Sequence, residues 1–75
     1  MIRESKMTIK QVASNLCYIT CETRDGNAKW RKQGVIPVLG TLDQVRAERV
    51  ANQTKWGWTL YDIEDAETLI FWKEV

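Results

Sequence analysis

Residues 16–26 read Leu-Cys-Tyr-Ile-Thr-Cys-Glu-Thr-Arg-Asp-Gly, and residues 29–38 read Lys-Trp-Arg-Lys-Gln-Gly-Val-Ile-Pro-Val. The first run favours a strand from Leu16 to Thr23 because it is rich in β-branched and aromatic residues. Asp25-Gly26 is a strong signal for a two-residue turn, so the second run is expected to return as the partner strand. The two runs together predict an antiparallel hairpin.

The register of this hairpin follows from the Asp-Gly turn. A two-residue turn places Glu22 opposite Lys29, and their opposite charges support this pairing. We expect a bulge at Gly34, and we expect the strand to end, or to lie at a sheet edge, near Pro37, which cannot donate a ladder hydrogen bond.

The residues that follow predict a helix and then a second hairpin. Thr41 can cap the helix and Gln44 can complete a capping box, so the helix is expected from Leu42 to about Thr54. Strands are then expected at residues 59–63 and 68–75, with an acidic turn between them.

This order predicts an α+β fold in which a single antiparallel sheet has one helix packed on one face, in the order ββαββ. The chain has 75 residues, of which 44% are hydrophobic and 28% charged, so residues 1–75 are expected to form a single domain around one core. The spacing of the apolar residues in residues 1–14 is ambiguous between a helix and a strand, and we expect a flexible or loosely packed N-terminal segment there.

The composition argues against catalysis. The chain has no histidine, and no Ser or Cys has the adjacent base that a nucleophile needs. Cys17 and Cys21 are expected to be free thiols, because residues four apart on a strand are too distant for a disulfide. We therefore expect no catalytic residue, no metal and no cofactor. No apolar run is long enough to span a bilayer or to act as a signal peptide, which predicts a cytoplasmic protein without a membrane partner.

Three groups of charged residues are candidates for binding a partner. Lys29-Trp30-Arg31-Lys32 interleaves cations with an aromatic ring that could stack on a base or fill a protein pocket. In the structural alternative, Trp30 belongs to the core and the cations are a solvated strand face. Arg46 and Arg49 lie one helical turn apart and could clamp carboxylates or phosphates, or serve only solubility. The acidic candidates are Asp62, Glu64, Asp65 and Glu67, whose other interpretation is a solvated loop.

The net charge of +1 gives no bulk attraction to nucleic acid or to a basic partner, so any charge-driven recognition is expected to come from local patches. A host protein complex is the expected partner, with nucleic acid as the alternative. The last strand, residues 68–75, is expected at an exposed edge of the sheet. A homodimer that pairs through this edge is a further hypothesis.

Several segments resemble small phage-encoded inhibitors. They are Tyr18-Ile19-Thr20-Cys21-Glu22-Thr23, the Asp25-Gly26 turn, Ile36-Pro37-Val38 before Thr41-Leu42-Asp43, and Gly57-Trp58 at the start of a strand. The inhibitors with this pattern include one of bacterial RNA polymerase and some anti-CRISPR proteins. The resemblance implies a phage or mobile-element accessory protein that acts in host takeover, in the bacterial host cytosol, by occupying a surface of a host machine without catalysis.

A second resemblance is to DNA-binding domains of the MerR and excisionase type. It is carried by residues 8–13, 30–37 and 57–63, which match the order of that family's landmarks. It implies a DNA-binding regulator whose basic residues contact phosphates. The Asp25-Gly26 turn and its β-forming neighbours stand where a recognition helix would be needed.

Overall fold

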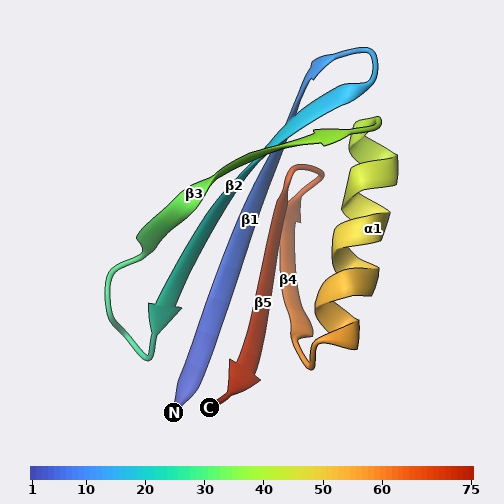
Figure 1. Ribbon diagram of the computed structural model, residues 1–75. Coiled ribbons are helices and arrows are strands. Elements are labelled where there is room, and N and C mark those ends of the chain that lie inside the picture. Colours follow the sequence, from blue (N-terminus) through green and yellow to red (C-terminus); the bar gives the residue numbers. More distant parts are fainter.

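The computed structural model describes the backbone of residues 1–75 and the side chains of residues 1–61 and 65–75. It contains one antiparallel sheet of five strands and one helix (Figure 1). The elements along the chain are β1 (Ile2–Ala13), β2 (Leu16–Asp25), β3 (Arg31–Leu39), α1 (Leu42–Lys55), β4 (Thr59–Asp65) and β5 (Thr68–Glu74). The strands lie side by side in the order β3-β2-β1-β5-β4. This confirms the predicted α+β class with a single antiparallel sheet and one helix.

The N-terminal segment differs from the expectation of a loosely packed arrangement, because residues 2–13 form the central strand β1. This strand pairs with β2 on one side and with β5 on the other. The side chains of Ser5, Met7 and Ile9 are buried on one face. On the other face, Glu4 lies opposite Arg24 and Lys6 lies opposite Glu22 of β2, so two pairs of opposite charge join the strands there.

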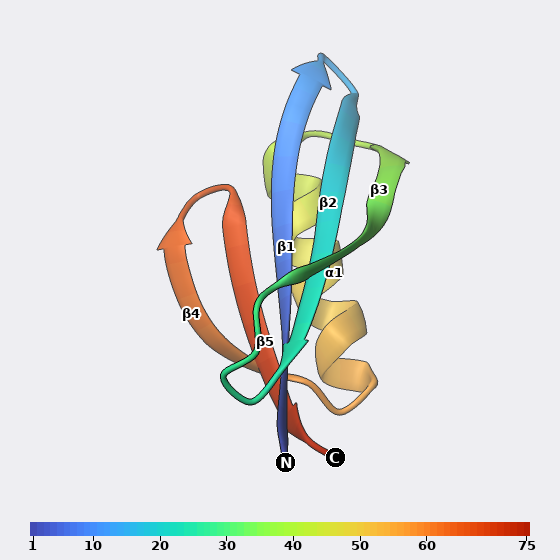
Figure 2. The same ribbon diagram turned by 90° about the vertical axis from the view of Figure 1, so that its left-hand side faces the viewer.

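Helix α1 covers one face of the sheet, and the core lies between them. The buried cluster comprises Met7, Ile9, Cys17, Ile19, Val45, Leu69 and Phe71. Val45 is the buried residue of the helix itself. Figure 2 looks onto the sheet from the side opposite α1 and shows no helix over that face. We call this side the open face; it carries the even-numbered side chains of β1, β2 and β5.

The helix begins at the predicted residue. Thr41 and Gln44 form the capping box, with the Leu42 backbone N–H donating to Oε1 of Gln11 at 2.8 Å. Gly40 precedes the cap with φ of +139°, and a Cβ atom there would lie 3.1 Å from Cγ2 of Val45. Among the described residues, no helix combines the length and the apolar character that crossing a bilayer requires.

The hairpin of β2 and β3 has a longer connection than the two-residue turn expected. Strand β2 continues to Asp25, which lies opposite Arg3 of β1, so Asp25 belongs to the sheet. As a result Glu22 lies opposite Lys32 and not opposite Lys29. A bulge is present in β3, one residue before the expected Gly34: Gly34 pairs with Cys21 and Lys32 with Glu22, which leaves Gln33 as the extra residue.

The edge strands are β3 and β4. The expectation that residues 68–75 lie at an exposed edge is wrong, because β5 pairs with β1 as well as with β4. The central strand β1 supplies the neighbour that the sequence did not reveal.

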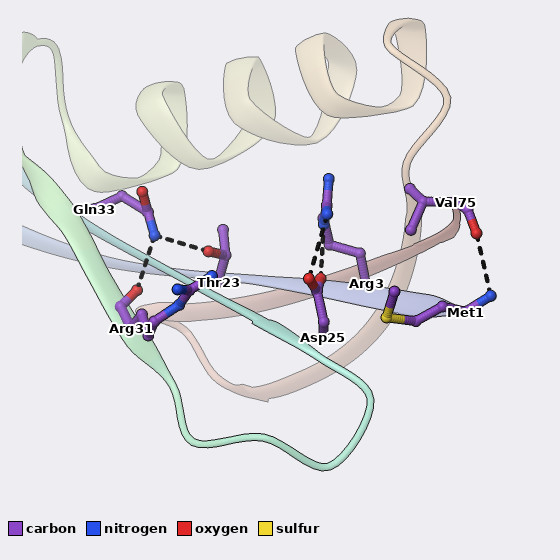
Figure 3. Close-up of polar contacts among 7 residues, drawn as sticks. All are labelled: Met1, Arg3, Thr23, Asp25, Arg31, Gln33 and Val75. Atoms are coloured by element: carbon purple, nitrogen blue, oxygen red, sulfur yellow. Dashed lines mark hydrogen bonds and ion pairs between the residues drawn. The ribbon is translucent and has the colours of Figure 1, made fainter.

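The two ends of the chain meet at one end of the sheet (Figures 1 and 3). The Met1 ammonium donates to the carbonyl of Val75 at 3.1 Å, and the Val75 backbone N–H donates to the carbonyl of Met1 at 2.9 Å. The ladder between β1 and β5 therefore extends to the terminal residues.

Candidate interaction surface

A network of charges around one indole ring occupies the middle of the open face. Arg24 Nε donates to Oε1 of Glu4 at 2.9 Å, and Lys6 Nζ lies 3.9 Å from Oε1 of Glu22. Both cations also lie over the ring of Trp30, with Lys6 Nζ 4.7 Å and the Arg24 guanidinium carbon 4.3 Å from its centroid. We call Glu4, Lys6, Glu22, Arg24 and Trp30 the Trp30 network. Its positive charges are engaged within the protein.

An apolar patch lies beside this network, over β2 and β3. It consists of Tyr18, Val35, Pro37 and Leu39, and we call it the Tyr18 patch. Tyr18 lies opposite Pro37 in the ladder, which places both side chains on the open face. Tyr18 is 42% exposed and Leu39 is 76% exposed. Contiguous exposed apolar residues of this kind mark interaction sites more often than scattered ones do.

A shallow hollow of about 330 Å³ lies at the other end of the open face, and its lining is Ile2, Glu4, Tyr61 and Trp72. Glu4 of β1 lies directly opposite Trp72 of β5. In β4, Leu60 pairs with Phe71 and Asp62 with Ile70, so Tyr61 is the extra residue of a bulge, and it lines the hollow together with Trp72. We call this site the Trp72 hollow.

The basic segment predicted from the sequence is divided in the structure. Trp30 is half-buried against Lys6 and Arg24. It is therefore neither a ring left free for a partner nor a residue of the main core, because it packs on the sheet outside the buried cluster. Lys32 lies on the open face, opposite Glu22. Lys29 is exposed in the connection between β2 and β3.

Arg31 lies on the side of the sheet that carries α1, together with a separate set of polar contacts (Figure 3). Arg3 Nε donates to Oδ1 of Asp25 at 2.7 Å and Arg3 Nη2 to Oδ2 at 3.3 Å. The hydrogen bond from Arg3 lowers the pKa of Asp25, with a smaller contribution from the charge of Arg31. Gln33 Nε2 donates to Oγ1 of Thr23 at 2.9 Å and to the carbonyl of Arg31 at 3.4 Å. These contacts fix the bulged start of β3.

The two helix arginines are not part of the open face. Arg46 lines a shallow depression on α1 with Asp43, Ala47 and Val50. Arg49 Nη2 pairs with Glu48 at 3.0 Å, while its Nε is buried without a hydrogen-bond partner among the described residues. The charge of Arg49 lowers the pKa of the Cys21 thiol, but desolvation by burial is the larger effect and raises it.

Of the acidic candidates, Asp62 and Glu64 lie within β4, and Asp65 and Glu67 lie at the tip of the hairpin of β4 and β5. Asp65 and Glu67 are exposed there, and the Glu67 backbone N–H donates to Oδ1 of Asp65 at 2.8 Å, which lowers the pKa of that carboxyl. The side chains of Asp62 and Glu64 lie outside the described residues. Asp65 thus has a structural role in the turn.

The structure also reveals surface residues that the sequence analysis did not select, namely Tyr18, Leu39, Tyr61 and Trp72. Tyr18, Leu39 and Trp72 alternate along their strands with residues that face the core, so a period of two in the sequence was the signal that could have found them. Tyr61 is the extra residue of a bulge and does not follow this alternation. Within residues 1–61 and 65–75, no three Cys, Asp or Glu side chains are grouped as metal ligands would be.

No protein-family model matches this sequence, and neither a curated protein nor a solved structure matches the chain. Residues 8–13, which contribute to the resemblance to MerR and excisionase domains, lie in β1, and residues 30–37 lie in and beside β3.

Proposed function

We propose that this protein is a non-catalytic binding protein of a phage or another mobile element that occupies a surface of a host macromolecular machine and so inhibits it. The open face carries this proposal. No helix covers this face, the connection between β2 and β3 folds over part of it, and apolar groups are exposed at the Tyr18 patch and the Trp72 hollow. The resemblance to phage inhibitors supplies the class of partner.

The charges of the open face favour a protein partner over nucleic acid. Phosphate binding needs cations that are free to replace counterions. Lys6 and Arg24 are instead paired with Glu22 and Glu4, and the exposed cations of this face among the described residues, Lys10 and Lys32, lie apart on β1 and β3. The aromatic residues Tyr18, Tyr61 and Trp72 on either side of the Trp30 network match the enrichment of aromatic residues at protein interfaces.

The sheet edges are less suited to pairing with another chain. Edge strand β3 contains Pro37 and the bulge at Gln33, and edge strand β4 has two register shifts. Both features oppose the addition of a further strand. We therefore propose that the partner binds to the open face and not to an edge strand.

A pull-down from bacterial lysate tests the proposal with two charge-matched variants. Leu39→Asp places a carboxylate in the Tyr18 patch, and Ala51→Asp places one on the exposed outer side of α1. Neither side chain is buried, so both variants should fold. We expect a protein complex retained in near-stoichiometric amount by the wild type and by Ala51→Asp, but at least about tenfold less by Leu39→Asp, as for a central interface residue.

Two results would contradict the proposal. Equal retention by both variants would exclude the open face as the binding surface. Loss of the bound material after nuclease treatment would show that nucleic acid holds it, and would favour the DNA-binding alternative with Lys29, Arg31 and Lys32 as phosphate contacts. Sedimentation of the purified protein would detect a homodimer formed in place of a hetero-complex.

A further inference from the structure

The Trp72 hollow is lined by both aromatic residues and an acidic residue. Tyr61 and Trp72 contribute two aromatic rings, and Glu4 contributes a carboxylate beside them. Tyr61 is 66% exposed, so its ring is accessible from solvent. Ile2 adds an apolar wall that can contact the carbon chain of a ligand.

The carboxylate of Glu4 has capacity for another donor. Arg24 Nε bonds to Oε1 of Glu4, and Oε2 accepts no hydrogen bond from any described residue. Because Arg24 already pairs with this carboxylate, the hollow offers a remaining acceptor oxygen and not an unbalanced negative charge. A neutral aliphatic ligand would cover it without giving it a donor, which is unfavourable.

The half-buried indole rings of Trp30 and Trp58 each have a cation over one face. Trp30 lies beneath Lys6 and Arg24, and Trp58 lies beneath Lys73 at 5.1 Å. Trp72 is half-buried too, yet no cation of the described residues lies over its ring. Electron-rich ring faces attract ammonium and guanidinium groups, and a carboxylate nearby strengthens that attraction.

We propose that the Trp72 hollow receives a positively charged side chain, lysine or arginine, from a segment of the partner protein. The ammonium or guanidinium group lies between the two rings and Glu4, and the carbon chain lies along Ile2. This inference rests on the proposed function, since it names the chemistry of the partner at one end of the open face. It predicts that the host surface is basic at this point.

Nuclear magnetic resonance tests the inference with small probes. The probe is Nα-acetyl-lysine N-methylamide, and its uncharged match is Nα-acetyl-norleucine N-methylamide at the same ionic strength. The indole N–H signal of Trp72 is assigned from Trp72→Phe. We expect the lysine probe to shift this signal saturably, with an affinity in the millimolar range, and the norleucine probe to bind about fivefold more weakly or not at all.

Variants locate the effect. Tyr61→Leu changes an exposed residue and should weaken binding of the lysine probe about fivefold. Tyr18→Leu alters the other exposed tyrosine of the same face and should leave it unchanged. Glu4→Gln should weaken binding and remove much of its dependence on salt.

Three outcomes would overturn the inference: equal shifts with both probes, no shift of the Trp72 signal with either, or a shift that Tyr61→Leu leaves intact. The inference and the proposed function can fail separately. Probe binding without loss of the complex in Leu39→Asp would leave the hollow as a cation site but would remove the proposed use of the open face, and with it the partner as the source of the cation. Loss of the complex without probe binding would remove only the cation site.

Discussion

The guanidinium carbon of Arg24 lies 4.3 Å from the centroid of the Trp30 ring. The same guanidinium donates to Glu4 of the central strand. Trp30 belongs to the connection between β2 and β3, so this stacking fixes the connection onto the open face. The position of the loop depends on side chains of β1 and β2 more than on its own turn.

Replacement of Trp30 tests this dependence. Trp30→Ala should lower the free energy of unfolding by about 2 kcal/mol, because it removes contacts with two cations and part of a buried ring. Trp56→Ala, which changes an indole that is 71% exposed, should cost less than about 0.5 kcal/mol. Urea unfolding followed by circular dichroism compares them without relying on tryptophan fluorescence. Equal losses would show that the Trp30 ring is not held by the sheet.

The ion pair of Arg3 and Asp25 predicts a dependence of stability on pH. The pKa of Asp25 is lowered below its ordinary value of 3.8, so its folded form holds a proton less tightly than its unfolded form. The pair therefore stabilises the fold above about pH 3.8, and this contribution is lost as the pH falls through the lowered pKa. Asp25→Asn should make the unfolding midpoint less sensitive to acid in that range. An unchanged acid dependence would contradict the role of this pair.

Gly40 and Val45 provide a test by a double-mutant cycle. Gly40→Ala should cost about 2 kcal/mol, because φ of +139° is strained for a residue with a side chain and because the new Cβ lies 3.1 Å from Cγ2 of Val45. In the Val45→Ala background the close contact with Cγ2 is absent, so the loss of stability caused by Gly40→Ala should be smaller by about 0.5 to 1 kcal/mol. Thermal unfolding of all four proteins in the same stabilising osmolyte measures the coupling. A coupling of zero would assign the whole cost to the backbone.

The contact of Gln11 with the helix start predicts a long-range capping effect. Gln11→Ala leaves the Leu42 N–H without its acceptor and should lower stability by about 1 kcal/mol. The adjacent exposed residue provides the control, since Lys10→Ala changes no hydrogen bond to α1. Hydrogen exchange at Leu42 should accelerate in the first variant alone. Exchange that is equally slow in both would mean that another group caps this N–H.

The helix and the second hairpin could be predicted from the sequence because their signals are local. Thr41 and Gln44 form a capping box within a single turn, and two β-rich runs flank the acidic turn that ends at Glu67. Each signal needs no information from distant residues. The helix consequently begins at the predicted residue, Leu42.

The central strand could not be predicted in this way because its signal lies in another strand. Glu4 and Lys6 look like ordinary surface charges until they are placed opposite Arg24 and Glu22 of β2. Pairing β1 with β2 also draws Asp25 into the ladder, which lengthens the next connection and changes the register of β3. One unrecognised strand thus accounts for the missed position of β5, the wrong turn and the unnoticed open face.

The backbone hydrogen bonds between Met1 and Val75 make the chain nearly a closed ring. A short glycine-rich linker could join these residues, and new ends could then be opened between β2 and β3, where Asn27 and Ala28 are exposed. Such a circular permutant would keep every strand pair while freeing the Trp30 connection from one of its anchors. It would separate the contribution of that loop to recognition from its contribution to the sheet.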